Sequence, residues 1–449
     1  MQQDNLVLFD LPGVGGKKVT AAFDGGRLTS NAGVLLLREV DRRLGIAERL
    51  AACLVDRRDA SRIDHSVVEM LRFRTFAIAA GYEDADDCDA LRDDPAFKMA
   101  VGRLPESGDP LCSQPTMSRL ENAPGWRSLG RMMAAMVDLF CDSWKTVPKR
   151  IVIDIDDTWD EAHGAQQLAL FNAYYDGYGF LPIHIYEATS GKLVAAILRS
   201  GKTPDGGEVR AILKRVIRHI RKRWPRVDIL VRGDSHYARP EALDWLDDNA
   251  IAYVFGLAGN PTLKARVAAG AEDAALRRVL AGAQAKVKVR RFGAFAYAAK
   301  SWRQERRVIA RIEASDRGLD VRFVVTNLAD KPKRLYERIY CRRGQMENLI
   351  KAHKTHLASD RTSCHSAAAN QFRLILHSAA YWLLHALRAA APRRSWWRRA
   401  QFDTLRLRLI KLAARVIEKA SRIRVALASS CPDKEILTHL ARAFAAQGP

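Results

Sequence analysis

Acidic residues at three places in the sequence, one of which is a pair of aspartates, could hold metal ions. Asp154 and Asp156 stand two residues apart in the apolar run 150–156, which predicts a strand with both carboxylates on one face. Helices bury such a strand on both sides, so two carboxylates there are costly unless they are paired or bind a cation. The alternative is a solvated strand end. Asp234 follows a second apolar strand, 228–233, at the carboxyl end where ligands of α/β sheets gather.

A third acid, Glu347, lies within a helical pattern that runs from Leu335 to about Leu357. At about 100° per residue, Tyr340, Arg343, Glu347 and Lys354 fall in one narrow stripe of that helix. Residues of these types do not make a core face. A solvated face of salt bridges is the alternative, but here two phosphate-binding side chains flank a single acid.

Together these acids make an all-oxygen site for hard cations. Mg²⁺ is held by few carboxylates plus substrate phosphate. Two such ions stabilise both the attacking and the leaving oxygen in phosphodiester chemistry, so no Cys or His nucleophile is needed. We expect Arg343 and Lys354 to contact the DNA backbone near the scissile bond, Arg343 through the paired donors of its planar guanidinium and Lys354 through its compact ammonium charge.

The composition favours a nucleic-acid partner. The 449 residues include 73 Lys and Arg against 51 Asp and Glu, for a net charge of +22. Such a surplus argues against an acidic binding protein and indicates a polyanion as the partner. Hydrophobic residues make up 48% of the chain, which excludes a wholly disordered protein. The seven cysteines form no C-x-x-C pair, so we expect reduced thiols, a cytoplasmic protein and no zinc finger. No apolar run reaches the ~20 residues that span a bilayer.

The hydrophobic period divides the chain into five regions. Residues 1–148 are predicted to be a mostly helical DNA-binding domain. In it Ser113 begins a helix that places Arg119 near a phosphate-binding end or, alternatively, only caps a bundle helix. Strands near 150–156, 180–187, 192–198, 227–233 and 252–257, with helices between the later ones, predict one mixed α/β sheet in region 149–258. Region 259–333 is rich in β segments, 334–392 is helical, and 393–449 is predicted to be a basic helical tail.

Four motifs carry a resemblance to a known family. The run Tyr340-x2-Arg343-x3-Glu347-x6-Lys354 matches the signature of a large group of bacterial insertion-sequence transposases with an RNase H-like DDE core. The sequence resembles most closely the thirteen-eighty family of insertion sequences, in the motifs Asp154-Ile-Asp-Asp-Thr158, Phe171-x-x-Tyr-Tyr-Asp-Gly177 and Arg232-Gly-Asp-Ser235. The likeness covers nearly the whole chain.

The resemblance implies cut-and-paste DNA transposition by Asp156, Asp234 and Glu347 on two Mg²⁺ ions, for which Mn²⁺ could substitute. It implies an RNase H-like core formed by 149–258 and 334–392, interrupted by the β-rich insertion 259–333. The expected partners are terminal inverted repeats, target DNA and a second copy of the chain on paired ends. No membrane is involved, and the expected location is the bacterial nucleoid.

Two assignments stay open at this stage. The group's first catalytic aspartate stands two residues before a Thr, which selects Asp156, yet Asp154 has the same facing and remains the alternative. Trp302, between Lys300 and Arg303, could stack on a flipped base during hairpin formation or could pack inside the insertion. The pair His236-Tyr237 departs from the small-plus-aromatic pair usual after the second aspartate.

Two other classes of function compete with a transposase. One is an RNase H-like nuclease without strand transfer, and the other is a non-catalytic DNA-binding protein derived from a transposase. The presence of all three acids argues against the second. The products separate the first from a transposase, because a nuclease leaves cut ends whereas a transposase joins them to target DNA.

Overall fold

The computed structural model describes residues 11–281 and 287–445, and the chain divides into two compact units. Unit 1 combines residues 1–123 with 379–449, and unit 2 spans 124–378. The predicted boundaries at 148 and 392 therefore differ from the observed ones. The C-terminal region is part of the same unit as the N-terminal region, and the helix α7 (Trp126–Asp142) belongs to unit 2.

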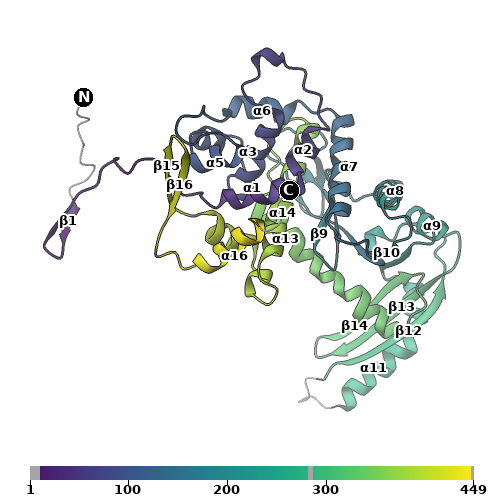
Figure 1. The fold of residues 1–449 in the computed structure, drawn as a ribbon. Coiled ribbons are helices and arrows are strands. Elements are labelled where there is room, and N and C mark those ends of the chain that lie inside the picture. Colours follow the sequence, from purple (N-terminus) through teal and green to yellow (C-terminus); the bar gives the residue numbers. More distant parts are fainter. Residues whose placement is uncertain (1–10, 282–286, 446–449) are drawn as a thin grey trace. The chain divides into compact units, whose positions relative to one another are not determined.

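Unit 2 is built on one mixed sheet (Figure 1). Its eight strands run in the order β12-β13-β14-β11-β10-β4-β8-β9, with β4, β10 and β11 parallel and the other neighbours antiparallel. The first five in sequence are β4 (Arg150–Asp157), β8 (Ile183–Glu187), β9 (Lys192–Ile197), β10 (Asp228–Gly233) and β11 (Ala252–Leu257). All five predicted strands therefore lie in a single sheet, as expected. This mixed α/β class is confirmed.

The helices of unit 2 cover this sheet through apolar faces. In α8 (Gly206–Arg223), whose N-cap Asp205 accepts a hydrogen bond from the Glu208 amide at 2.8 Å, the buried side chains recur at helical spacing. They are Val209, Leu213, Val216, Ile217 and Ile220, whereas Arg210, Arg215, Arg218 and Lys222 are exposed. A shorter helix, α9 (Pro240–Asp248), connects β10 to β11 and packs against α8.

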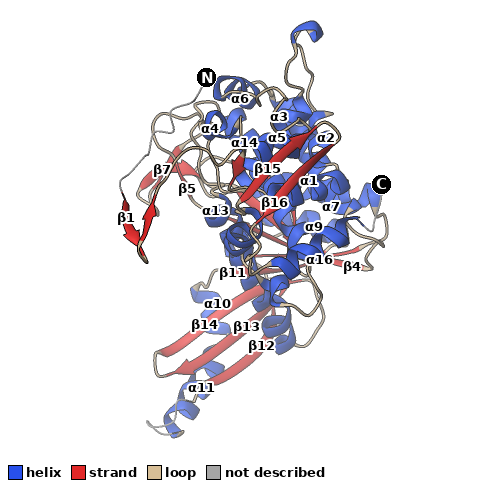
Figure 2. Cartoon of the chain, turned by 60° about the vertical axis from the view of Figure 1, so that its left-hand side comes forward, coloured by secondary structure: helices blue, strands red, loops and turns tan. Residues whose placement is uncertain are grey.

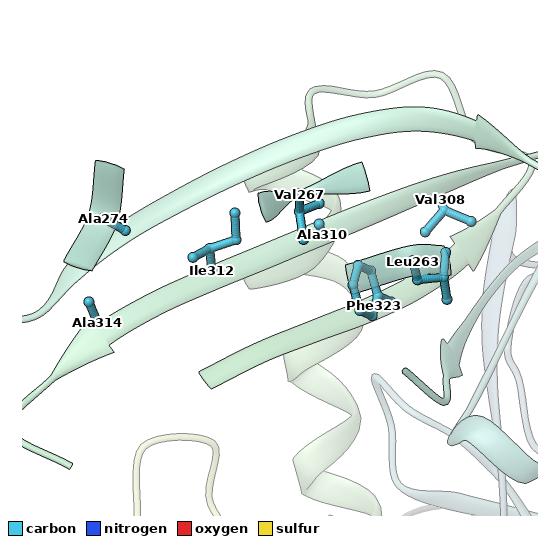
Figure 3. Packing of buried hydrophobic residues seen from close by; sticks show 8 residues of the cluster. All are labelled: Leu263, Val267, Ala274, Val308, Ala310, Ile312, Ala314 and Phe323. Carbon is cyan, nitrogen blue, oxygen red and sulfur yellow. The ribbon is translucent and has the colours of Figure 1, made fainter. Parts of the chain in front are cut away.

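The segment expected to be a separate β-rich insertion extends the same sheet. It holds two helices, α10 (Pro261–Arg266) and α11 (Ala268–Leu280), followed by β12 (Val289–Tyr297), β13 (Arg306–Ser315) and β14 (Gly318–Thr326). Because β14 pairs with β11, the three strands continue the core sheet. Figure 3 shows how the helices are held on them, by contacts of Leu263, Val267 and Ala274 with Val308, Ala310, Ile312, Ala314 and Phe323.

Two further parts of unit 2 border the carboxyl ends of the central strands. A small three-stranded sheet, in the order β5-β7-β6, consists of β5 (Asp160–Glu161), β6 (Leu170–Asn172) and β7 (Gly177–Phe180). After β14 the chain is helical but irregular: α12 (Pro332–Arg334) is followed by a π-helical turn, Leu335–Tyr340, a 3₁₀ turn, Cys341–Gly344, and α13 (Gln345–Leu357). The helix α14 (Ala367–Ala390) begins in unit 2 and ends in unit 1.

Unit 1 is mostly helical, as predicted for the N-terminal region. Its main helices are α1 (Val34–Leu44), α2 (Ile46–Ala51), α3 (Val67–Ala79), α4 (Asp87–Leu91), α5 (Pro95–Val101), α6 (Gln114–Asn122), α15 (Phe402–Leu405) and α16 (Lys434–Ala445). A two-stranded hairpin, β1 (Leu11–Val14) and β2 (Lys17–Val19), precedes them. In the described part of the chain, no helix is both long and apolar enough to cross a membrane.

The expectation of a wholly helical C-terminal tail is wrong for its middle. Ala414–Lys419 and Arg422–Leu427 form the antiparallel strands β15 and β16 (Figure 2). The strand β15 also pairs with β3 (Leu28–Thr29). Alternate residues of β15, Ala414 and Val416, are buried, which is the period of a strand and not of a helix.

Candidate active site

Two aspartates meet at the carboxyl ends of the parallel strands β4 and β10. Arg232 of β10 lies opposite Asp154 of β4. Because the two strands are parallel, Asp234 comes beside Asp156 two residues further along. Arg343 lies between these carboxylates, with its Nη2 3.2 Å from Asp156 Oδ2 and 3.7 Å from Asp234 Oδ2. The structure thus brings together three of the residues that the sequence nominated.

Asp154 has a different role from Asp156. Its side chain is fully buried and receives two hydrogen bonds from Arg232, from Nε at 2.7 Å and from Nη2 at 2.8 Å. Burial raises the pKa of Asp154, although Arg232 counteracts part of that rise. Arg232 also donates to the Ile339 carbonyl at 2.6 Å, and so ties both strands to the π-helical turn. Asp154 is therefore committed to an internal ion pair, and Asp156 is the carboxylate that faces Asp234.

A hydrogen-bonded network that the sequence analysis missed supports Asp234. His236 Nδ1 lies 2.8 Å from Asp234 Oδ1, and its Nε2 lies 2.8 Å from Asp157 Oδ2. The Tyr237 hydroxyl donates to the same Asp157 oxygen at 2.9 Å. Burial alone would lower the pKa of His236, but the two carboxylates raise it to about 9. A protonated imidazole can donate to both carboxylates, which fixes the orientation of Asp234.

The electrostatic environment of Asp156 is unusual for a carboxylate. Burial raises its pKa to about 7, and the charges of Asp234 and Asp157 add to this rise while Arg343 opposes it. An acid in such a place is stabilised as the anion by a nearby cation.

The helical stripe predicted for the four-residue signature is not regular. The 3₁₀ turn Cys341–Gly344, which lies between Tyr340 and Gln345, changes the rotation per residue, so positions cannot be projected at a constant angle. Tyr340 points back to the sheet, where a Cβ added at Gly256 would lie 2.8 Å from its hydroxyl. Glycine at 256 permits this approach, and it also leaves space for the backbone of Asp234.

Glu347 does not join the two aspartates in this structure. It lies in the first turn of α13 and its side chain is exposed. Among residues 11–281 and 287–445, no group of three or more His, Cys, Asp or Glu side chains is placed to hold a metal ion. The expected convergence of three carboxylates is thus not seen.

Lys354 contacts protein groups instead of pointing to solvent. Its Nζ lies 3.4 Å from Asp160 Oδ1 and 3.8 Å from Asp360 Oδ2, and it donates a hydrogen bond to the Trp159 carbonyl. Asp160 is buried, which raises its pKa to about 8 even with the lysine beside it. Lys354 therefore anchors the segment that follows β4, a function that differs from the expected phosphate contact.

Above about pH 8, where Asp160 is ionised, we expect Lys354→Ala to destabilise the protein by about 3 kcal/mol, because the carboxylate would stay buried without its cation. The loss should shrink as the pH falls and Asp160 is protonated. Urea unfolding measures this change, with Lys354→Arg as the control that keeps the charge. Unchanged stability, together with a DNA affinity that depends less steeply on salt by about one ion, would return Lys354 to a phosphate contact.

The two other nominated DNA-binding residues lie outside this cluster. Trp302, between β12 and β13, packs edge-on against Tyr297 with ring centroids 5.5 Å apart and lies beneath the Arg306 guanidinium at 5.3 Å. These contacts favour the packing alternative. Arg119, on α6 of unit 1, is exposed and donates to the Thr116 hydroxyl at 3.0 Å.

The family model described as transposase DDE domain group 1 matches residues 11–448. The chain belongs to this transposase family. A search of curated proteins found no match. Among solved structures, a piggyBac transposase synaptic complex with hairpin DNA is similar with a TM-score of 0.41 and 10% identity, over 86% of this chain and 81% of that one.

In this DDE family member, the donor atoms around Asp156 and Asp234 fit a hard divalent cation. Both residues offer carboxylate oxygens, and Mg²⁺ is commonly held by one or two carboxylates together with phosphate oxygens. The half-buried Asp156 carboxylate also favours a cation, because Arg343 only partly offsets its loss of solvation. Two protein carboxylates therefore suffice for a first ion, and Glu347 is outside that set.

Proposed function

We propose that this chain is a DNA transposase that excises an insertion sequence and joins it to target DNA. The observation that carries the proposal is the pairing of Asp156 with Asp234 at the ends of adjacent parallel strands, with Arg343 of the Tyr-Arg-Glu-Lys signature between them, in a member of a DDE family. We further propose an RNase H-like core and membership of the thirteen-eighty family of bacterial insertion sequences, acting on nucleoid DNA.

The chemistry proposed is phosphodiester transfer at the terminal inverted repeats. Water attacks the phosphorus at the element end and the 3′ oxygen leaves. The freed 3′-OH attacks a phosphodiester of the opposite strand and forms a hairpin, and a second water opens the hairpin and regenerates the 3′-OH. That 3′-OH then attacks a phosphodiester of the target, whose own 3′ oxygen leaves. Each step forms one P–O bond and breaks one, so no external energy source is needed. Two divalent ions, Mg²⁺ or Mn²⁺, would stabilise the attacking and leaving oxygens when bound.

Different residues of the chain would bind the ions, orient an acid and contact the phosphate. Asp156 and Asp234 would hold the ions, and Glu347, one turn beyond Arg343, is the third carboxylate of the proposed set. His236 orients Asp234, while Arg343 lies within reach of a phosphate placed beside the acids. A guanidinium suits that task because its fork matches two phosphate oxygens. A second copy of the chain on paired ends would supply the synapsis that excision needs.

A joining assay tests this proposal. With millimolar Mg²⁺ or Mn²⁺, we expect the purified protein to cut a donor plasmid at the element ends and to join the freed ends to a second plasmid. We expect EDTA to abolish both steps. Sequencing of the junctions should reveal short direct duplications of the target. Cut ends without joined products would favour a nuclease, and binding without cutting would favour a non-catalytic DNA-binding protein.

A further inference from the structure

The small sheet beside the acids exposes an unusual set of aromatic rings. We call the surface formed by its strands β5, β6 and β7 and the turn 173–176 the aromatic sheet. The side chains of Tyr174 and Tyr178 are 87% and 61% exposed, and two further rings are exposed nearby, Phe171 and Tyr175. Soluble proteins rarely leave large rings clustered in water unless something binds there.

The rings are held in an ordered arrangement. Tyr175 stacks on Trp159 with centroids 4.7 Å apart and planes 9° from parallel, and Tyr174 packs edge-on against Tyr175 at 4.9 Å. The turn that presents them is closed by Asn172, whose carbonyl accepts from the Tyr175 amide and whose side-chain oxygen accepts from the Tyr174 amide. Rings fixed in this way lose little entropy when a ligand stacks on them.

The aromatic sheet adjoins the candidate active site. Trp159 follows Asp156 by three residues, and its carbonyl is held by Lys354 from α13. The indole lies against the backbone of β7, where a Cβ added at Gly179 would come within 2.7 Å of the ring. The pKa of Tyr175 is raised by its partial burial and, to a smaller extent, by the nearby charges of Asp157, Asp156 and Asp234. A strand with its scissile phosphate at the acids would thus pass beside these rings.

The charge of this segment distinguishes bases from phosphates as its partner. Lys and Arg account for 73 of the 449 residues, yet none occurs in residues 158–180, which include Asp160, Glu161 and Asp176. Such a segment is poorly suited to the phosphate backbone. Nucleobases are different, because every base offers an uncharged π face that stacks on an aromatic ring.

We propose that the aromatic sheet binds an unpaired nucleobase of the DNA strand next to the scissile phosphate, by stacking on Tyr174, which packs against the Trp159–Tyr175 pair. The proposal rests on the proposed function for the location of the strand. The sequence suggested Trp302 as the residue that stacks on a base, but its ring is packed between Tyr297 and Arg306. The proposal assigns that role to the aromatic sheet. It also gives Lys354 a task in the reaction, as the residue that positions Trp159 under the rings.

The test compares single-stranded with fully paired DNA of the same sequence. The probe is an oligonucleotide that carries 2-aminopurine, whose fluorescence is quenched by stacking, and binding is measured without divalent ions. We expect Tyr174→Ala to weaken single-strand binding by about 5- to 100-fold and to reduce the quenching, with duplex affinity changed less than about twofold. Tyr174→Phe keeps the ring and should bind as the unaltered protein does. Tyr178→Ala is the control, because Gly177 and Gly179 face Trp159 and Tyr178 therefore lies on the other face of β7.

The outcomes that would overturn the proposal are distinct. For Tyr174→Ala, equal losses for single strand and duplex or no loss for either would contradict base stacking. A loss in Tyr174→Phe, or an equal loss in Tyr178→Ala, would contradict it as well. A changed sedimentation coefficient in Tyr174→Ala, with DNA binding unaltered, would assign the rings to contact with a second copy of the chain. Because Tyr174 is almost fully exposed, its Ala variant should melt within about 2 °C of the unaltered protein.

The joining assay separates this proposal from the proposed function. If the unaltered protein neither cuts nor joins DNA with Mg²⁺ or Mn²⁺, the proposed function fails, whatever the tyrosine variants do. If it cuts and joins while Tyr174→Ala binds the single strand normally, only the stacking proposal fails.

Discussion

Asp156→Asn and Asp234→Asn are each expected to reduce divalent-dependent cleavage by about 10³-fold or more, because each change removes a ligand charge while it keeps the shape of the side chain. DNA binding should remain nearly intact, since the net charge of +22 is spread over surfaces outside the acid pair. Cleavage of an end-labelled substrate and a gel-shift assay measure the two quantities on the same preparations.

Glu347→Gln completes this series. Glu347 is exposed and lies outside the acid pair in the structure, so its participation requires that α13 or the bound DNA brings it closer. Loss of cleavage in Glu347→Gln would support the three-carboxylate mechanism, and full cleavage would contradict it. Retained activity in Asp156→Asn would contradict the choice of Asp156 as the first aspartate.

Arg232→Met is expected to destabilise the protein by about 3–5 kcal/mol, because Asp154 would be left buried without its partner. Asp154→Asn should also lose stability, since it leaves the Arg232 guanidinium buried beside a neutral amide. Urea unfolding at constant m-value measures both losses. The double variant Asp154→Leu with Arg232→Met removes both charges and should regain most of the stability.

The matched control for this prediction lies two residues away on the same strand. Asp156→Asn should change the free energy of unfolding by less than about 1 kcal/mol, since burial and neighbouring acids already disfavour its charge. The two substitutions would thus have different effects, with Asp154 required for stability and Asp156 required for cleavage. The reverse result, with Asp156→Asn unstable and Asp154→Asn stable but inactive, would exchange their roles.

The strands of the central sheet could be predicted from the sequence because their apolar runs are long and their ends are clearly marked. The position of Asp234 beside Asp156 also followed from strand order, since the ends of neighbouring parallel strands meet at one edge. The pairing of Asp154 with Arg232 could also have been predicted from the sequence. Arg232 precedes Asp234 by the same two residues by which Asp154 precedes Asp156, so parallel pairing that joins the acids also joins Asp154 to Arg232.

Other features could not be read in this way. The helical stripe assumed a constant rotation per residue, which the π-helical and 3₁₀ turns between Leu335 and Gly344 do not keep. Lys354 was taken as a phosphate contact because its partner, Asp160, carries no local signal of burial. In the tail, the density of Arg and Lys masked the alternation of Ala414–Lys419, although the buried Ala414 and Val416 follow a strand period. Such pairings depend on tertiary contacts between distant segments.

The composition of unit 1 has a consequence for the order of folding during synthesis. Unit 2 is one continuous stretch, 124–378, and all eight strands of its main sheet have left the ribosome before residue 379 is added. Unit 1 must wait, because β3 can pair with β15, and Arg43 can donate to the carbonyls of Ala443 and Phe444, only after residues 414–444 have been synthesised. The nascent chain can therefore carry the assembled main sheet of unit 2 while its N-terminal helices still lack a part of their core.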